Sequence, residues 1–289
     1  MIQIQILPDG KRLHLQHGPI DLVIEAWGKA AEVRAAYDQA NAAFQNLLTD
    51  LVAELPLLRA PLGAEQPAPQ GPVARRMVEA CWPYRAGFIT PMAAVAGAVA
   101  DHVLAALISG RDLTKAYVND GGDVALHLGE GQRLACGMVA DLQVPAIAGT
   151  IELTSAMPVR GIATSGAPTK GSGGRSFSFG IADAVTVLAE SAAAADAAAT
   201  MIANAVDLPD DARVRRLPAT SLDPDSDLGD RLVTVEVPPL GADDIARALR
   251  EGLDVAEWLH AVGRIHGAVL ALQGRFALCG TAVPRMLAA

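Results

Sequence analysis

Aromatic residues are scarce in this sequence. They make up 4% of its 289 residues, whereas hydrophobic residues make up 51% and charged residues only 19%. The apolar content therefore comes mainly from Ala, Val, Leu and Ile, and Ala-rich helices can approach one another closely. We predict a folded chain with a core of small side chains, which excludes disorder as its dominant state. The length suits one large domain over residues 1–289 or two packed α+β subdomains within it.

Cysteine is also rare. Cys81, Cys136 and Cys279 are far apart and form no CxxC spacing, which argues against a disulfide framework and a zinc ribbon and fits a reducing compartment. The first residues contain no basic segment followed by an apolar one, as a signal peptide would. The apolar run 93–108 carries Asp101 and His102 and is too short and polar to span a bilayer. We expect a cytoplasmic protein without a membrane partner.

Basic residues are outnumbered, 23 against 32 acidic ones, so the formal net charge is -9. No stripe of Lys and Arg is interleaved with aromatic residues. This pattern excludes nucleic acid as a partner. A small anionic ligand would need backbone N–H groups, an isolated Arg or a metal ion held by acidic residues.

Strand and helix patterns alternate irregularly along the chain. Strands are predicted at residues 2–6, 13–15, 20–26, 117–118, 124–128, 132–138, 148–153, 184–189 and 232–237, and helices at residues 29–55, 92–108, 191–206, 243–250 and 255–272. The Gly/Ser/Thr-rich segment 161–180 and the Asp/Pro-rich segment 207–230 are predicted to be loops. This pattern predicts an α+β fold of layered antiparallel sheets flanked by helices.

The helix at 191–206 carries the clearest chemical signal. Asp196, Thr200 and Asn204 are spaced four residues apart and form one polar stripe among Ala, Ile, Val and Met. If the helix is packed on most sides, the carboxylate needs a partner, and a hard cation such as Mg²⁺ would take oxygen ligands from Asp and Thr. Alternatively, the stripe faces solvent. Asp101, in another small-residue helix, is a capped or exposed polar position.

Two glycine-rich segments are candidates for ligand binding. Residues 163–176 combine hydroxyls, glycines and Arg175, and could hold phosphate oxygens, although Ser172 stands where a P-loop needs Lys. The alternative is a flexible surface loop. Residues 119–123 read Asn-Asp-Gly-Gly-Asp, which is either a hairpin turn or a close approach to a planar ligand. No GxSxG or catalytic-Cys signature is present, which disfavours covalent hydrolysis.

In this order, the segments MAAVAGAVAD, YVNDGGDVAL, GIATSG, AVTVLA and AAADAAAT resemble the ApbE-like superfamily of FAD:protein FMN transferases, most clearly over residues 92–206. The resemblance implies an ApbE-like fold that binds FAD or FMN with Mg²⁺ and transfers FMN to a protein or other acceptor. The residues it assigns to the metal are Asp196, Thr200 and the carbonyl of Ala96. Those it assigns to the nucleotide are Asn119, Gly121, Gly122, Asp123, Thr164, Ser165 and Gly166, and Arg175 is added from its place in the loop.

The chain also departs from the transferase pattern. It reads Ala96-Gly97-Ala98 where the transferases carry a Lys, and residues 176–183 contain no His, with Asp183 as a candidate for the motif's Asp. The missing groups leave catalysis open. A noncatalytic binding or scaffold protein on the same fold and an enzyme of unrelated chemistry remain alternatives. The sequence leaves the oligomeric state open, including a homo-oligomer.

Overall fold

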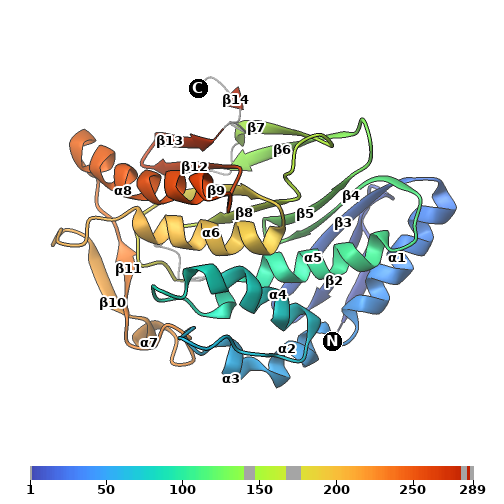
Figure 1. The fold of residues 1–289 in the computed structure, drawn as a ribbon, viewed down its shortest axis with the longest axis horizontal. Coiled ribbons are helices and arrows are strands. Elements are labelled where there is room, and N and C mark those ends of the chain that lie inside the picture. Colours follow the sequence, from blue (N-terminus) through green and yellow to red (C-terminus); the bar gives the residue numbers. More distant parts are fainter. Residues whose placement is uncertain (1, 140–146, 167–176, 281–284, 287–289) are drawn as a thin grey trace. The chain divides into compact units, whose positions relative to one another are not determined.

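The computed structural model describes residues 2–139, 147–166, 177–280 and 285–286 (Figure 1). The chain divides into two compact units. The first unit consists of residues 1–134, 153–163 and 189–197, and the second unit of residues 135–152, 164–188 and 198–289. Both units combine antiparallel strands with helices, so the α+β class is confirmed.

The sheet of the first unit is an antiparallel meander. Its strands follow the order β1-β2-β3-β4-β5, and the first residues of β8 pair with β5. The bounds are β1 Gln3–Ile6, β2 Leu13–His17, β3 Ile20–Gly28, β4 Leu113–Asp120, β5 Asp123–Leu128 and β8 Gly161–Ser165. Alternate residues of β2 and β3 are buried, as expected for strands with one face on a core. The two predicted hairpins, at the start of the chain and around residue 121, are therefore confirmed.

Helices cover this sheet. They are α1 Ala30–Phe44, α2 Leu47–Ala53, α3 Leu55–Leu58, α4 Pro72–Cys81 and α5 Val95–Ile108, with short 3₁₀ turns η1 Trp82–Tyr84 and η2 Pro91–Ala94. The helix α5 packs on β4 and β5 and beside α1 (Figure 1). The core between them contains Leu15, Leu22, Ile24, Phe44, Val103 and Val118.

The segment Pro91–Ile108 is, within the described ranges, the one helix long and apolar enough to cross a membrane by length and composition. The sequence prediction was that the apolar run 93–108 is too short and too polar to span a bilayer. More than half of the segment, 56%, is buried inside the protein. Such burial is typical of a core helix.

The second unit contains three sets of strands. β9 Ala184–Ala189, β12 Gly267–Leu272 and β13 Arg275–Gly280 pair in that order. A separate three-stranded sheet has the order β14-β7-β6, with β6 Arg133–Val139, β7 Ile147–Thr154 and β14 Arg285–Met286. β10 Arg215–Pro218 pairs with β11 Leu232–Glu236. The helices are α6 Ala192–Ala205, which begins in the first unit, α7 Ala219–Leu222 and α8 Ala242–Ala261.

Several expected elements were wrong. Residues 29–55 form α1, α2 and the start of α3 instead of one helix, and the loop expected at 207–230 contains β10 and α7. The segment 255–272 is the end of α8 followed by β12, because an unbroken apolar run such as Gly-Ala-Val-Leu-Ala-Leu suits a buried strand as well as a helix. The glycine-rich segment 161–180 begins with β8, and its residues 167–176 lie outside the described residues.

Candidate functional site

In the first unit, α5 and the first turns of α6 are joined by hydrogen bonds from backbone N–H groups to side-chain carboxylates. The carboxylate of Asp101 in α5 accepts the N–H groups of Ala192 and Ala193 at 3.0 and 2.9 Å. The carboxylate of Asp196 in α6 accepts the N–H of Gly97 in the first turn of α5 at 3.1 Å. Free N–H groups at a helix N-terminus favour a negatively charged partner. Each helix therefore supplies a carboxylate to the start of the other, about 95 residues away in sequence.

Gly97 is required for this contact. A Cβ atom at this position would lie 2.3 Å from the carbonyl oxygen of Ala192, far inside the usual contact distance. No side chain fits there, so the two helices meet backbone to backbone. This is the close approach that the small-residue composition predicted, and it leaves no room for a Lys at position 97.

Three carboxyl groups gather where α6 meets the β4–β5 hairpin. Asp120 and Asp123 face each other across the hairpin and are each only 8% exposed. The side chain of Asp123 is hydrogen-bonded to that of Asp196. We call Asp120, Asp123 and Asp196 the carboxyl cluster.

The environment of Asp120 and Asp196 favours their protonated forms. Burial, followed by the neighbouring charges of Asp123 and Asp120, holds the pKa of Asp196 well above its usual range. Burial is also the main cause that raises the pKa of Asp120 to about 7, while a hydrogen bond from the N–H of Asp21 opposes this shift.

The predicted turn at 119–123 is a hairpin turn in the structure. The side-chain oxygen of Asn119 accepts the N–H of Gly122 at 2.8 Å. Gly121 and Gly122 have φ angles of +62° and +116°, which L side chains rarely adopt. The turn therefore explains Asn119, Gly121 and Gly122 and fixes the position of Asp123. Their role in nucleotide binding stays a prediction.

The two other predicted metal ligands are Thr200, on the same helix as Asp196, and the carbonyl of Ala96 on α5. Thr200 is one helical turn after Asp196, is half-buried, and its hydroxyl forms no hydrogen bond with any described residue. Ala96 precedes Gly97, and their peptide is trans. Because the C=O and N–H of a trans peptide point in opposite directions, the Ala96 carbonyl points away from the Asp196 oxygen that contacts Gly97.

The predicted nucleotide residues of the Thr-Ser-Gly motif belong to the second unit. The hydroxyls of Thr164 and Thr186 lie 2.9 Å apart, and Ser165 ends β8. Gly166 has a φ of +116° and packs tightly, since a Cβ there would lie 2.9 Å from the carbonyl oxygen of Ala182. Arg175 falls outside the described residues.

Two further polar residues have structural partners within the second unit. The side-chain oxygen of Asn204, the last member of the predicted stripe, accepts the N–H of Phe179 and the hydroxyl of Ser178 at 3.0 and 3.2 Å. The carboxylate of Asp183 accepts the N–H of Gln273, which has a φ of +44° in the β12–β13 turn. Asn204 and Asp183 therefore hold local backbone.

Asp196 and Thr200, both on α6, fit a hard divalent cation that keeps most of its coordination sites for a ligand and water. Among the residues that the structure describes, no three His, Cys, Asp or Glu side chains are arranged to hold a metal ion by themselves. One carboxylate with a hydroxyl one helical turn away is, however, the sparse oxygen set that Mg²⁺ uses when phosphates complete its coordination. The like charges of the carboxyl cluster would also be relieved by a cation.

Comparison with known protein families identifies the family of this chain. The family model described as AbpE bacteria matches residues 4–278. The chain belongs to this family. The resemblance inferred from the motifs is thus confirmed at the level of the family.

Relatives of this AbpE bacteria family member include uncharacterised archaeal proteins. The chain is 36% identical over 143 residues to a UPF0280 protein of Methanothermobacter thermautotrophicus, covering 49% of this chain and 52% of the relative. It is 39% identical over 146 residues to a UPF0280 protein of Methanopyrus kandleri, covering 50% and 53%. The chain thus spans about half the length of these curated relatives.

Solved structures similar to this family member include two flavin transferases. The apo form of the flavinyl transferase ApbE of Pseudomonas stutzeri has a TM-score of 0.44 and 14% identity, covering 97% of this chain and 95% of that one. The flavin transferase ApbE of Vibrio cholerae has a TM-score of 0.41 and 13% identity, covering 98% of both chains.

Proposed function

We propose that this protein binds a flavin nucleotide, FAD or FMN, together with Mg²⁺ at the carboxyl cluster of the first unit. The observation that carries the proposal is the contact of Asp196 with Asp123 and with the N-terminus of α5, next to Asp120. The pKa values of Asp120 and Asp196 are raised by burial and by neighbouring carboxyls, and backbone N–H groups oppose this shift. A divalent cation bound by Asp196 and Thr200 would balance this charge and would hold a pyrophosphate. Membership of the family supports the same ligand.

The chain's own residues prepare this site. The N–H of Gly97 orients the carboxylate of Asp196, and Asp101 fixes the start of α6, four residues before Asp196. Asn119 closes the turn that positions Asp123. Asn119, Gly121 and Gly122 are the proposed ligand contacts in this unit, and the assignment of Thr164, Ser165, Gly166 and Arg175 to the nucleotide stays a prediction. We place the protein in the cytoplasm, with a protein as the possible acceptor of FMN and a second copy as a further partner.

The alternative function is a noncatalytic scaffold, and one observation favours it. Asp196 already has a structural use, because it accepts the N–H of Gly97. An Asn in its place would keep an oxygen for this hydrogen bond but would carry no charge. The substitution Asp196→Asn therefore separates the two functions.

Titration of FAD into the purified protein, followed by flavin fluorescence in Mg²⁺ or in EDTA, tests the proposal. We expect binding that requires Mg²⁺ in the wild type, and binding weakened at least about tenfold in Asp196→Asn with an unchanged melting temperature. The control Asp254→Asn removes an exposed carboxylate of α8 and should bind like the wild type. Equal affinity in Asp196→Asn, or binding that ignores EDTA, would refute the Mg²⁺ site at Asp196, and no FAD binding at all would favour the scaffold function.

Transfer is tested separately from binding. Transfer of FMN from FAD to a Thr hydroxyl forms a new bond from the hydroxyl oxygen to the FMN phosphorus, breaks the pyrophosphate, releases AMP and returns the hydroxyl proton to solvent. Incubation with FAD, Mg²⁺ and a Thr-containing acceptor peptide, followed by mass spectrometry of the peptide and assay of AMP, measures both products. An unmodified peptide alongside Mg²⁺-dependent FAD binding would limit the protein to a binding function.

A further inference from the structure

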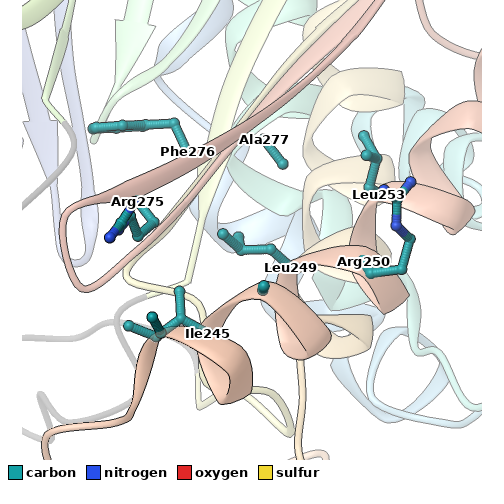
Figure 2. Close-up of a pocket in the computed structure, with 9 residues that line it drawn as sticks. Ile245, Leu249, Arg250, Leu253, Arg275, Phe276 and Ala277 are labelled. Atoms are coloured by element: carbon teal, nitrogen blue, oxygen red, sulfur yellow. The ribbon is translucent and has the colours of Figure 1, made fainter.

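A groove runs between α8 and β13 in the second unit (Figure 2). Its volume is about 280 Å³. It is lined by Ala242, Ile245, Ala246, Leu249, Arg250, Leu253, Arg275, Phe276 and Ala277. The lining positions of α8 are spaced three and four residues apart, so they form one face of the helix.

The groove has an apolar floor with a cationic group toward each end. Ile245, Leu249 and Ala277 are part of the apolar lining, and Figure 2 shows Arg275 and Arg250 on opposite sides of Leu249. Both arginines are exposed, and within the described part of the chain neither has an ion-pair or hydrogen-bond partner. The lining contains no Asp or Glu, although the whole chain carries a net charge of -9. This separation of charge suits an anionic ligand.

The strand beside the groove has a free edge. In the described residues β13 pairs only with β12, through a hairpin with a two-residue turn. In such a hairpin the N–H and C=O groups alternate between the partner strand and the outer edge, so those of Ala277 bond β12 and those of Phe276 and Leu278 point outward. Both of these side chains are 40% exposed. A long apolar edge of this kind is a template for another strand.

We propose that this groove binds an extended peptide segment, which adds to the edge of β13 as a further strand. Side chains of an added strand alternate between its two faces, so every second residue would face α8. The matching segment carries apolar residues over Leu249 and Ala277 and an acidic residue at each end, within reach of Arg275 and Arg250. Main-chain hydrogen bonds supply affinity, and the two guanidinium groups select acidic sequences.

A fluorescein-labelled peptide tests this site. The probe reads Thr-Asp-Thr-Val-Thr-Val-Thr-Asp-Thr, which places two Asp and two Val on one face of a strand, and its matched control has Lys in place of both Asp. We expect saturable binding of the Asp peptide by fluorescence anisotropy. The double variant Arg250→Glu/Arg275→Glu should bind it at least about tenfold more weakly and should prefer the Lys peptide. No saturable binding up to about 1 mM, or equal binding by the double variant, would overturn the proposal.

Hydrogen exchange locates the bound peptide. The amides of Phe276 and Leu278 should exchange more slowly when the Asp peptide is added, whereas the amide of Ala277, already bonded to β12, should not change. If those two amides are protected without peptide and the protein sediments as a dimer, the edge pairs with a second copy and the peptide proposal fails. Unchanged exchange at Phe276 and Leu278 despite binding would place the peptide elsewhere, which also refutes it.

Discussion

At the scale of single residues, Asp120 has a direct effect on stability. Its pKa is raised to about 7 in the folded protein by burial, whereas an exposed Asp has a pKa near 3.8. Between these values the folded state binds a proton that the unfolded state has lost, so stability is greatest below the unfolded pKa and falls as the pH rises through the folded one. A shift of about three units corresponds to at most about 4 kcal/mol.

We predict that, in EDTA, the free energy of unfolding of the wild type decreases between about pH 4 and about pH 7. Asp120→Asn removes the titrating group and should flatten this dependence, because a neutral amide costs less to bury than a carboxylate. Urea denaturation at a series of pH values measures it, with Asp254→Asn as the control. A wild-type curve that rises over this interval, or an equally steep curve in Asp120→Asn, would contradict the assignment.

The partners of Asp196 illustrate what one sequence can reveal about a site. Periodicity was enough to place Asp196, Thr200 and Asn204 on one stripe of one helix. It carried no signal that Gly97, about 100 residues earlier, would supply the hydrogen bond, or that Asp123 would be the neighbouring carboxyl. Such pairings depend on tertiary packing, which local spacing does not encode. Asp101 is the clearest omission, because no pattern in the sequence indicated its contact with the start of α6.

At the scale of elements, the contact of α5 with α6 depends on Gly97. We predict that Gly97→Ala lowers the free energy of unfolding by about 1–3 kcal/mol or more, because its Cβ would overlap the backbone of Ala192. Gly63→Ala is the matched control, since a Cβ at Gly63 meets nothing within 4 Å, and it should leave stability unchanged or slightly higher. Thermal or urea denaturation compares the two. A Gly97→Ala protein as stable as Gly63→Ala would show that the helices separate easily.

Elements were predictable where a local rule acted alone. The Gly-containing turns defined both hairpins of the first unit, and the strand at 184–189 agrees with β9. Local rules failed where two of them favoured different structures for the same segment. Two separate helices were expected at 243–250 and 255–272, yet α8 continues through Gly252, where a Cβ would lie 2.2 Å from the side chain of Val206. Close packing, a tertiary cause, placed that glycine in the helix.

At the scale of the whole molecule, the first unit is discontinuous in sequence. Residues 153–163 bring the start of β8 to β5, and residues 189–197 bring the first turns of α6 to Asp101. We predict that a fragment of residues 1–134 lacks a cooperative unfolding transition, because these two segments complete its sheet and its helix contacts. A fragment of residues 1–197 contains every segment of the unit and should unfold cooperatively. Circular dichroism during heating distinguishes them, and a sharp transition in residues 1–134 would disprove the prediction.

The mutual support of α5 and α6 also affects how the chain is made. The N-terminus of α5 obtains a carboxylate from Asp196, 99 residues later, and the N-terminus of α6 obtains its own from Asp101. At a typical synthesis rate of about 5–20 residues per second, α5 leaves the ribosome several seconds before its partner exists. During that interval its apolar surface is exposed, so assistance from a chaperone would matter most while residues 109–196 are being translated.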